Sequence, residues 1–336
     1  MGEISLSRRR HRPALCGTLL LSMKRILTAL VLIPLVLVAV FLAADWLLFA
    51  LIGAVAILAL SEYLHIIPAY QAANFRMPTV LITAAYFAMM AAALFVRSTN
   101  ALEIVLLATA AVFFFAPFVY LAAALAYVPA KPTSDDPAQK DSDMRPLLPG
   151  AAMAFFGIPY IGASLACLGV IRSTPAGWFL VVFTCLAVWV GDSAAMYVGK
   201  AFGRHKFSPR VSPNKTWEGA IASVAGAVIV CALYGHFAPQ IEHGLASIHQ
   251  LPEPGTTAPP LPATRVWASA LFAAIINIAA QLGDLFESLI KRGAGVKDSG
   301  TLLPGHGGML DRIDALLFAA PVALVMFTLL GSALFQ

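Results

Sequence analysis

The sequence predicts an all-α, polytopic transmembrane protein with about nine spans and a cytoplasmic amino terminus. Composition is the first observation: 60% of the 336 residues are hydrophobic and 12% are charged, whereas soluble proteins carry about 25% charged residues. The second is that the apolar residues form long runs, and a spanning helix needs about 20 of them. The third is an uneven distribution of Lys and Arg between the loops, which orients the chain.

Nine apolar runs are long enough to be spans, and only residues 68–77 separate the second from the third. The predicted spans are residues 26–42, 46–67, 78–96, 102–128, 147–171, 175–198, 217–237, 266–290 and 308–335. With the amino terminus inside, 19 of the 22 Lys and Arg residues fall on the cytoplasmic side and 3 fall outside. This asymmetry supports the orientation and places the polar segments 199–217 and 291–308 on the same cytoplasmic side.

The remaining segments set the domain organisation. Residues 1–25 form a basic extension that resembles the start of a signal peptide but lacks a small-residue cleavage site, so we expect a retained anchor from residue 26, with Met23 as an alternative start. We expect residues 26–171 to form the amino-terminal spans and residues 172–336 to form a carboxy-terminal transmembrane domain that holds the candidate catalytic residues. The polar segments 129–146 and 240–264 are predicted to be a flexible linker and an outside loop. The four scattered cysteines predict no disulfide framework and no zinc site.

Polar residues crowd the junction of the last two spans. They are Asp284, Glu287, Ser288, Lys291, Arg292, Lys297, Asp298, His306, Asp311, Arg312 and Asp314. A charged side chain in hydrocarbon costs at least ~2.5 kcal/mol, so this crowding predicts chemistry at the membrane surface. The alternative is structural: salt bridges at a helix end, or basic side chains that reach the interface from the last turn of a span.

Helix geometry groups these residues into two acidic faces. The eighth span carries four polar residues at i, i+3, i+4 and i+7 on one face: Asp284, Glu287, Ser288 and Lys291. Asp311 and Asp314 share a face in the first turns of the ninth span. We expect the two faces to approach each other, and carboxylates this close repel unless a cation neutralises them. Oxygen ligands without a His or Cys cluster favour magnesium or manganese over zinc.

Between these faces lies a glycine-rich turn, residues 304–308, followed by a helix start. Its backbone N–H groups and the helix dipole favour a phosphate. Three roles are open for His306: loop packing, phosphate contact or proton transfer. Carboxylates for a metal, with basic residues and glycines for phosphates, are the components of phosphoryl or nucleotidyl transfer.

A second polar constellation spans residues 191–219. Gly191, Ala195 and Gly199 recur every four residues, which predicts close approach of a neighbouring helix. Asp192 and Ser193 interrupt an apolar span, and a buried Asp needs a partner, for which a shared metal or substrate site is the simplest.

The loop that follows is basic. It carries Lys200, Arg204, Lys206, Arg210 and Lys215. For Arg204, Lys206 and Arg210, the alternative to a phosphate contact is an ordinary basic cytoplasmic loop. Lys215 is the better phosphate candidate because it precedes a helix start with Thr216 as the predicted cap and Glu218 in the first turn. Glu62 and His65, near the cytoplasmic end of the second span, either pair with a basic residue or line an entrance for lipid headgroups.

Two stretches resemble a known family. The pattern S-L-I-K-R (288–292), K-D (297–298) and P-G-H-G-G-M-L-D-R-I-D (304–314) resembles the signature of the phosphatidate cytidylyltransferases, or CDP-diacylglycerol synthases. The stretch from G-D-S-A to S-P-N-K-T-W-E-G (191–219) resembles the second shared region of that family. The resemblance covers about residues 175–335.

This resemblance implies a bacterial inner (plasma) membrane enzyme, with several spans and its active site at the cytoplasmic face. It would convert CTP and phosphatidate to CDP-diacylglycerol and pyrophosphate, with Mg²⁺ and a second, monovalent cation such as K⁺. The implied partners are CTP, phosphatidate and membrane lipid, without nucleic acid, and a homodimer is compatible with the resemblance.

The resemblance also implies residue roles, carried over position by position. The implied catalytic residues are Asp284, Lys291, Asp298 and Asp311. The implied metal ligands are Asp192, Asp284, Asp298 and Asp311. The implied substrate-binding residues are Ser193, Lys215, Ser288, Arg292, Lys297, His306 and Arg312.

Two other functions use similar residues. A CTP-dependent lipid kinase would move the γ-phosphoryl group to a lipid alcohol and release CDP. A transporter would use buried acids to relay ions, but transporters place such acids near the membrane midplane, often in symmetric halves. Here the acids cluster at one predicted membrane face and no internal repeat is visible, which favours the transferase.

Overall fold

The computed structural model of the chain describes residues 34–41, 43–67, 75–95, 101–127, 147–247, 260–302 and 307–335. The basic extension, the linker 129–146 and most of the first predicted span lie outside these ranges. Residues 34–41, within that span, are helical.

Helices make up nearly all of the described chain. They are α2 (Asp45–Ile66), α3 (Arg76–Phe95), α4 (Ala101–Tyr127), α6 (Leu147–Gly157), the π-helix η3 (Ile158–Ala163), α7 (Ser164–Arg172), α8 (Gly177–Phe202), α9 (Trp217–His236), α10 (Ala238–Ser247), α11 (Val266–Gly293) and α12 (Leu310–Phe335). Within the described ranges, eight helical stretches are long and apolar enough to cross a membrane, with α6, η3 and α7 forming one of them. Each matches one predicted span within a few residues, which confirms the all-α, polytopic class.

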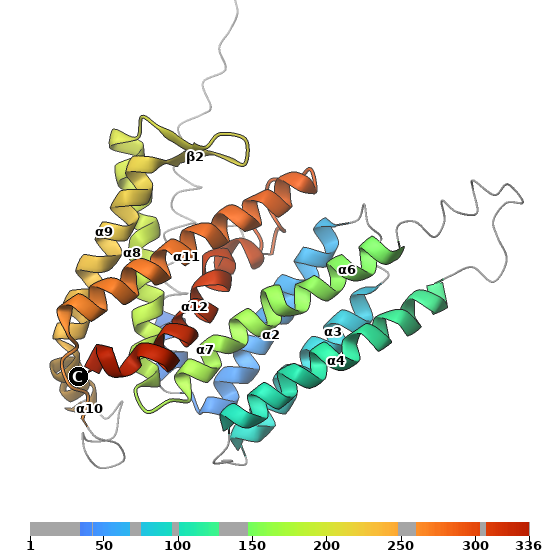
Figure 1. The fold of residues 1–336 in the computed structure, drawn as a ribbon, viewed down its shortest axis with the longest axis horizontal. Helices are drawn as coiled ribbons and strands as arrows, with labels where there is room; N and C mark the ends of the chain where they lie inside the picture. Colours follow the sequence, from blue (N-terminus) through green and yellow to red (C-terminus); the bar gives the residue numbers. More distant parts are fainter. Residues whose placement is uncertain are drawn as a thin grey trace, which may run out of the picture.

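Two groups of helices flank a central pair. Figure 1 shows α8 and α9 on one side, α2 to α7 on the other, and α11 and α12 between them. Helix α12 contributes to both apolar cores: Leu310 and Leu317 pack with the α2–α7 group, and Ala315 and Ala319 pack with α8 and α11. The central pair therefore joins the two groups, and the polar residues of the last two predicted spans lie on it.

Small residues bring α8 and α9 into close contact, as the four-residue spacing predicted. A Cβ atom on Gly219 would lie 2.9 Å from the Ala195 carbonyl oxygen and 3.4 Å from the Gly199 Cα. A Cβ atom on Gly191 would overlap the side-chain amide of Asn277 in α11 and lie 2.8 Å from Ser223 Oγ in α9. Gly191 thus sits where three helices meet.

Gly191→Ala is therefore expected to lower the melting temperature of the detergent-solubilised protein by about 4 °C or more, because overpacking a tight contact costs roughly 1–3 kcal/mol. The matched control is Gly331→Ala in α12, where an added Cβ meets nothing within 4 Å. That change is expected to be neutral or stabilising, since Ala favours a helix over Gly by up to about 1 kcal/mol. Equal melting temperatures for the two variants would contradict the packing argument.

Two segments predicted as loops contain regular structure. Residues 206–216 form an antiparallel hairpin of β1 (Lys206–Ser208) and β2 (Ser212–Thr216). Residues 240–247, predicted as part of an outside loop, belong to α10. Ile241 and Leu245 of α10 pack against the α8–α11 core, while Glu242 accepts a hydrogen bond from the Leu261 backbone at 2.8 Å. The prediction failed here because a short amphipathic helix lacks the long apolar run that identifies a span.

Candidate active site

The two motif-rich segments meet at one end of the helix bundle. Lys215 Nζ in β2 lies 2.8 Å from Asp284 Oδ2 in α11. Arg292, in the last turn of α11, donates from Nε to the Val211 carbonyl oxygen in the hairpin turn at 3.4 Å. The hairpin therefore packs against the end of α11, as expected for segments on the same side of the membrane.

Local structure fixes the position of Lys215. The next residue, Thr216, caps α9 by accepting a hydrogen bond from the Gly219 N–H at 3.2 Å, which confirms the predicted cap. Glu218, in the first turn of α9, lies 2.6 Å from His205 Nδ1 just before β1. The hairpin is thus tied to the helix at both of its ends, and Lys215 is held beside α11.

Four residues form what we term the hairpin cluster: Asp192, Lys215, Asp284 and Arg312. Asp192, on α8, interacts electrostatically with the other three members. Asp314, one turn into α12, also interacts electrostatically with Asp284 and Asp192. Acids from three helices thus approach two cations from the hairpin and α12. The predicted approach of the two acidic faces is confirmed, and the mixed charges suit recognition of a phosphate together with a cation.

A second group, termed the loop cluster, comprises Glu62, Glu287, Lys291, Ser299 and Asp311. Lys291 joins two of the acids: its Nζ contacts Glu287 Oε2 and lies 2.6 Å from Asp311 Oδ1. The Glu287 side chain is 0% exposed. Burying a carboxylate without a counter-charge is costly, so Lys291 compensates Glu287 as well as binding Asp311.

Both carboxylate oxygens of Asp311 are engaged by groups of the chain. Lys291 binds Oδ1, while Oδ2 accepts hydrogen bonds from Gly308 N at 2.8 Å and from Ser299 N and Oγ, each at 3.0 Å. Gly307 adopts a left-handed φ of 78°, and a Cβ there would lie 2.7 Å from Asp311 Oδ2. Asp311 therefore organises the turn before α12.

The helix start differs from the expected open cradle for an anion. The N–H groups of Met309 and Leu310 donate to Glu62 of α2, at 3.0 and 2.9 Å, and that of Gly308 donates to Asp311. These donors bind carboxylates of the protein itself. His306 lies outside the described residues.

Sequence reasoning expected Glu62 to pair with a basic residue or to line an entrance for lipid headgroups, whereas its hydrogen-bond partners are the Ser299 hydroxyl and two backbone N–H groups. Its one available signal was a carboxylate near the end of an apolar span, since an acid placed there needs a partner. That partner turned out to be a loop more than 230 positions later in the chain. Ser299 was missed as well: it is 2% exposed and donates to both Glu62 and Asp311, although it lies between residues of the recognised pattern.

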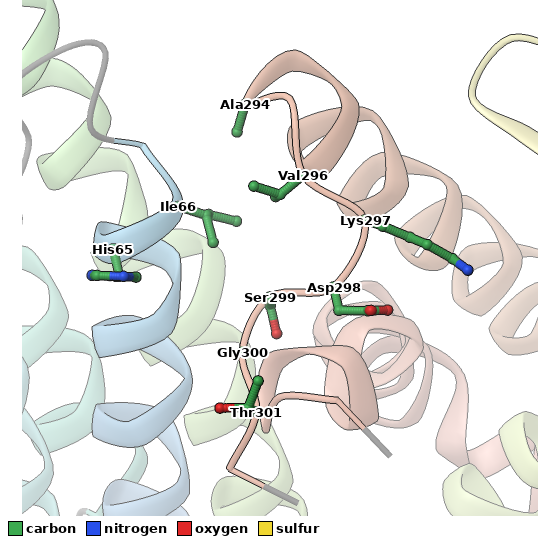
Figure 2. A pocket seen from close by; sticks show the side chains of 9 residues that line it. All are labelled: His65, Ile66, Ala294, Val296, Lys297, Asp298, Ser299, Gly300 and Thr301. Atoms are coloured by element: carbon green, nitrogen blue, oxygen red, sulfur yellow. The ribbon is translucent and has the colours of Figure 1, made fainter. Parts of the chain in front are cut away.

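A pocket of about 580 Å³ opens beside the loop cluster. Figure 2 shows it between the end of α2, with His65 and Ile66, and the loop 294–301 that follows α11. Ser299 projects from this loop, whereas the side chain of Lys297 points away from His65. The volume lies within the range of small-molecule sites, about 300–1,000 Å³.

The other predicted site residues that the structure describes either bond within their own helix or are exposed. Ser193 donates to the Trp189 carbonyl oxygen of its own helix at 2.8 Å, and Ser288 Oγ lies 3.5 Å from Asp284 Oδ1. Lys297, Asp298 and Arg312 are exposed, and no salt bridge between described residues engages them. These exposed charges are accessible to a ligand, whereas Lys215 and Lys291 are already paired.

The carboxylates of the site suit a Mg²⁺ ion that is held by one or two protein ligands together with the substrate. Across the described ranges, no three His, Cys, Asp or Glu side chains form a preformed metal cage. Mg²⁺ is commonly held by one or two carboxylates together with waters and substrate phosphates. Asp192 and Asp284 offer such oxygens, whereas Asp311 is saturated by protein donors. The metal roles of Asp192, Asp284, Asp298 and Asp311 stay predictions.

Comparison with known proteins relates the sequence of this chain to a family. The cytidylyltransferase family model matches residues 23–330. Proteins named phosphatidate cytidylyltransferase from Brucella suis biovar 1, Thermotoga maritima and Haemophilus influenzae are 40%, 42% and 38% identical over 169, 163 and 146 residues. These matches cover 49%, 48% and 43% of this chain and 53%, 53% and 44% of the relatives. The chain thus spans about half the length of the relatives it matches.

Proposed function

The chain belongs to the cytidylyltransferase family, and from that premise we propose that it is a phosphatidate cytidylyltransferase. It converts CTP and phosphatidate to CDP-diacylglycerol and pyrophosphate. The names of its relatives support these substrates. The observation that carries the proposal is the meeting of the hairpin and the ends of α11 and α12, where Lys215 contacts Asp284 and Lys291 contacts Asp311.

The reaction is a direct displacement. An ionised phosphate oxygen of phosphatidate attacks the α-phosphorus of CTP, and the bond from that phosphorus to the oxygen bridging to the β-phosphate breaks. Pyrophosphate leaves with the bonding electrons, so no covalent enzyme intermediate is needed. Because the nucleophile is already charged, the protein contributes positioning and charge neutralisation rather than a general base.

The residues divide this work by location. Arg312 and Lys297 are exposed cations for substrate phosphates, and Asp284 holds Lys215 in the hairpin cluster, to which Arg312 also belongs. Asp284 and Asp192 would hold a Mg²⁺ ion, which supplies charge neutralisation to the phosphates when bound. Lys291 keeps Asp311 and Glu287 together, and so orders the loop next to the pocket.

The site faces the cytoplasm at a bacterial inner membrane. Lys and Arg residues are concentrated on the side of the hairpin and of the loop 294–301, and cytoplasmic loops carry such an excess. Water-soluble CTP reaches the site from that side. Phosphatidate reaches it from the adjacent lipid leaflet, whose headgroups lie at the level of the helix ends.

Pyrophosphate release tests the proposal. Purified protein in vesicles containing phosphatidate, given Mg²⁺ and CTP, is expected to release pyrophosphate and form CDP-diacylglycerol in equal amounts. Omitting phosphatidate is expected to abolish both products. Formation of CDP from CTP and diacylglycerol, without pyrophosphate, would identify a kinase instead. If the protein catalyses neither reaction, the proposal is contradicted and the transporter is the remaining alternative.

A further inference from the structure

Glu62 connects the amino-terminal helices to the loop cluster. Its Oε1 accepts the Met309 N–H at 3.0 Å, and its Oε2 accepts the Leu310 N–H at 2.9 Å and the Ser299 hydroxyl at 3.0 Å. All three donors belong to the segment between α11 and α12 or to the start of α12. A single carboxylate on α2, that of Glu62, therefore accepts all three hydrogen bonds.

These bonds cap α12 from another helix. The first N–H groups of an α-helix have no partner within the helix, and Leu310 is its first residue. A carboxylate is favoured there by the helix dipole and by charge-assisted hydrogen bonds. Glu62 therefore supplies the cap that residues 307–309 do not supply with a side chain.

Ser299 extends the connection to Asp311. Its hydroxyl lies 3.0 Å from Glu62 Oε2 and 3.0 Å from Asp311 Oδ2, and its backbone N–H donates to Asp311. One hydroxyl proton can serve one acceptor at a time, so the buried Ser299 is shared between two carboxylates. A displacement of Glu62 would therefore change the hydrogen bond between Ser299 and Asp311.

Two glycines leave room for the Glu62 carboxylate. A Cβ on Gly300 would lie 2.7 Å from Glu62 Oε1, and a Cβ on Gly308 would overlap Glu62 Oε2 and Ser299 Oγ. Any larger residue at either position would push the carboxylate away. The small residues on both sides of the turn therefore match an acid that comes from α2.

We infer that Glu62 is a positioning residue of the active site. Through Ser299 and the start of α12 it holds Asp311, and with it the loop that carries Lys297 and Asp298. The active site is thereby completed by a helix outside the carboxy-terminal segment that carries the recognised motifs. The kinetic part of this inference rests on the proposed function, while its structural part does not.

Kinetics give the first test. Glu62→Gln puts an amide N–H₂ against a backbone donor and removes the charge, so kcat is expected to fall roughly tenfold or more. The KM values for CTP and phosphatidate are expected to change less than about threefold, because Glu62 touches neither the hairpin cluster nor the exposed cations. The matched control is Asp45→Asn, at the opposite end of α2, which removes the 3.0 Å ion pair with Arg172. Control activity is expected to match that of the wild type.

A double-mutant cycle separates positioning from general stability. Ser299→Ala cuts the connection between Glu62 and Asp311 without touching α2. If the two residues act as one unit, the double variant loses no more than about threefold in kcat beyond the weaker single variant. If the double variant instead loses kcat by the product of the two single losses, the two residues act independently, and the connection through Ser299 is overturned. Ser299→Ala also serves as the test variant if Glu62→Gln does not fold.

Hydrogen exchange tests the structural part without turnover. Backbone amides at 299–302 and 307–310 are expected to exchange faster in Glu62→Gln than in the wild type, with the amides of α8 unchanged. Asp45→Asn is expected to leave both regions as in the wild type. Unchanged exchange in Glu62→Gln, or kcat reduced equally in both variants, would overturn the inference. A wild-type protein that does not turn over CTP with phosphatidate would refute the proposed function, while exchange would still decide the role of Glu62.

Discussion

Asp284→Asn is expected to reduce cytidylyl transfer by about 100-fold or more, on the scale of the roughly 100- to 1,000-fold loss in kcat that follows removal of one preorganised electrostatic contact such as an oxyanion-hole donor. The substitution preserves shape and removes the charge that binds Lys215 at 2.8 Å. It also removes a proposed magnesium ligand that contacts Lys215 and interacts electrostatically with Asp192. Both effects act on the hairpin cluster and leave the apolar cores untouched.

The measurement is kcat for the purified variant beside the wild type and Asp45→Asn. Asp45 pairs with Arg172 at the other end of the bundle, so this control makes the same Asp-to-Asn change away from the site. All three proteins are expected to elute as one folded species with similar melting temperatures. Activity of a folded Asp284→Asn within about threefold of the wild type would remove Asp284 from the catalytic machinery.

Lys291→Met is expected to abolish activity and to lower stability as well. Lys291 is the counter-charge of two acids, one of which, Glu287, is 0% exposed. Removing one partner of a buried ion pair leaves an uncompensated charge and costs about 3–5 kcal/mol. The apparent melting temperature is therefore expected to fall by several degrees, together with kcat.

A second substitution separates the two effects. Adding Glu287→Gln to Lys291→Met removes the uncompensated buried charge, so the double variant is expected to recover most of the lost melting temperature. Its activity is expected to stay at background, because Asp311 still lacks the Lys291 contact at 2.6 Å. Recovery of activity along with stability would show that Lys291 serves only to compensate Glu287.

Hydropathy was sufficient to predict the spans because a membrane helix is specified locally. Each span needs a run of about 20 apolar residues, and such runs are visible without any knowledge of tertiary contacts. Eight of the nine predicted spans correspond to helices in the described residues, and the first lies largely outside them. The close α8–α9 packing was predictable for the same reason, since Gly191, Ala195 and Gly199 are spaced along one helix face.

The site was predictable in part. Helical spacing placed Asp284 and Lys291 on one face and Asp311 and Asp314 on another, and the structure brings these faces together. The pairing itself was not predictable: spacing does not specify that Lys215 contacts Asp284 or that Lys291 joins Asp311 to a buried acid. Such pairs depend on which helices are neighbours.

The hydrogen-bond partners of Glu62 could not be predicted from local sequence patterns. Its partners, Ser299, Met309 and Leu310, lie 237 to 248 positions away in the chain. No period or motif links α2 to the start of α12. The isolated carboxylate indicated that a partner must exist, but only the tertiary arrangement identifies it.

Transfer of label from CTP tests the central claim most directly. Purified protein is incubated with phosphatidate, Mg²⁺ and CTP labelled with ³²P at the α-phosphorus, and the products are extracted with chloroform. The predicted result is label in a chloroform-soluble liponucleotide with the wild type and Asp45→Asn, and almost none with Asp284→Asn. Label that stays in water-soluble products with the folded wild-type protein, whatever the lipid supplied, would contradict cytidylyl transfer to phosphatidate.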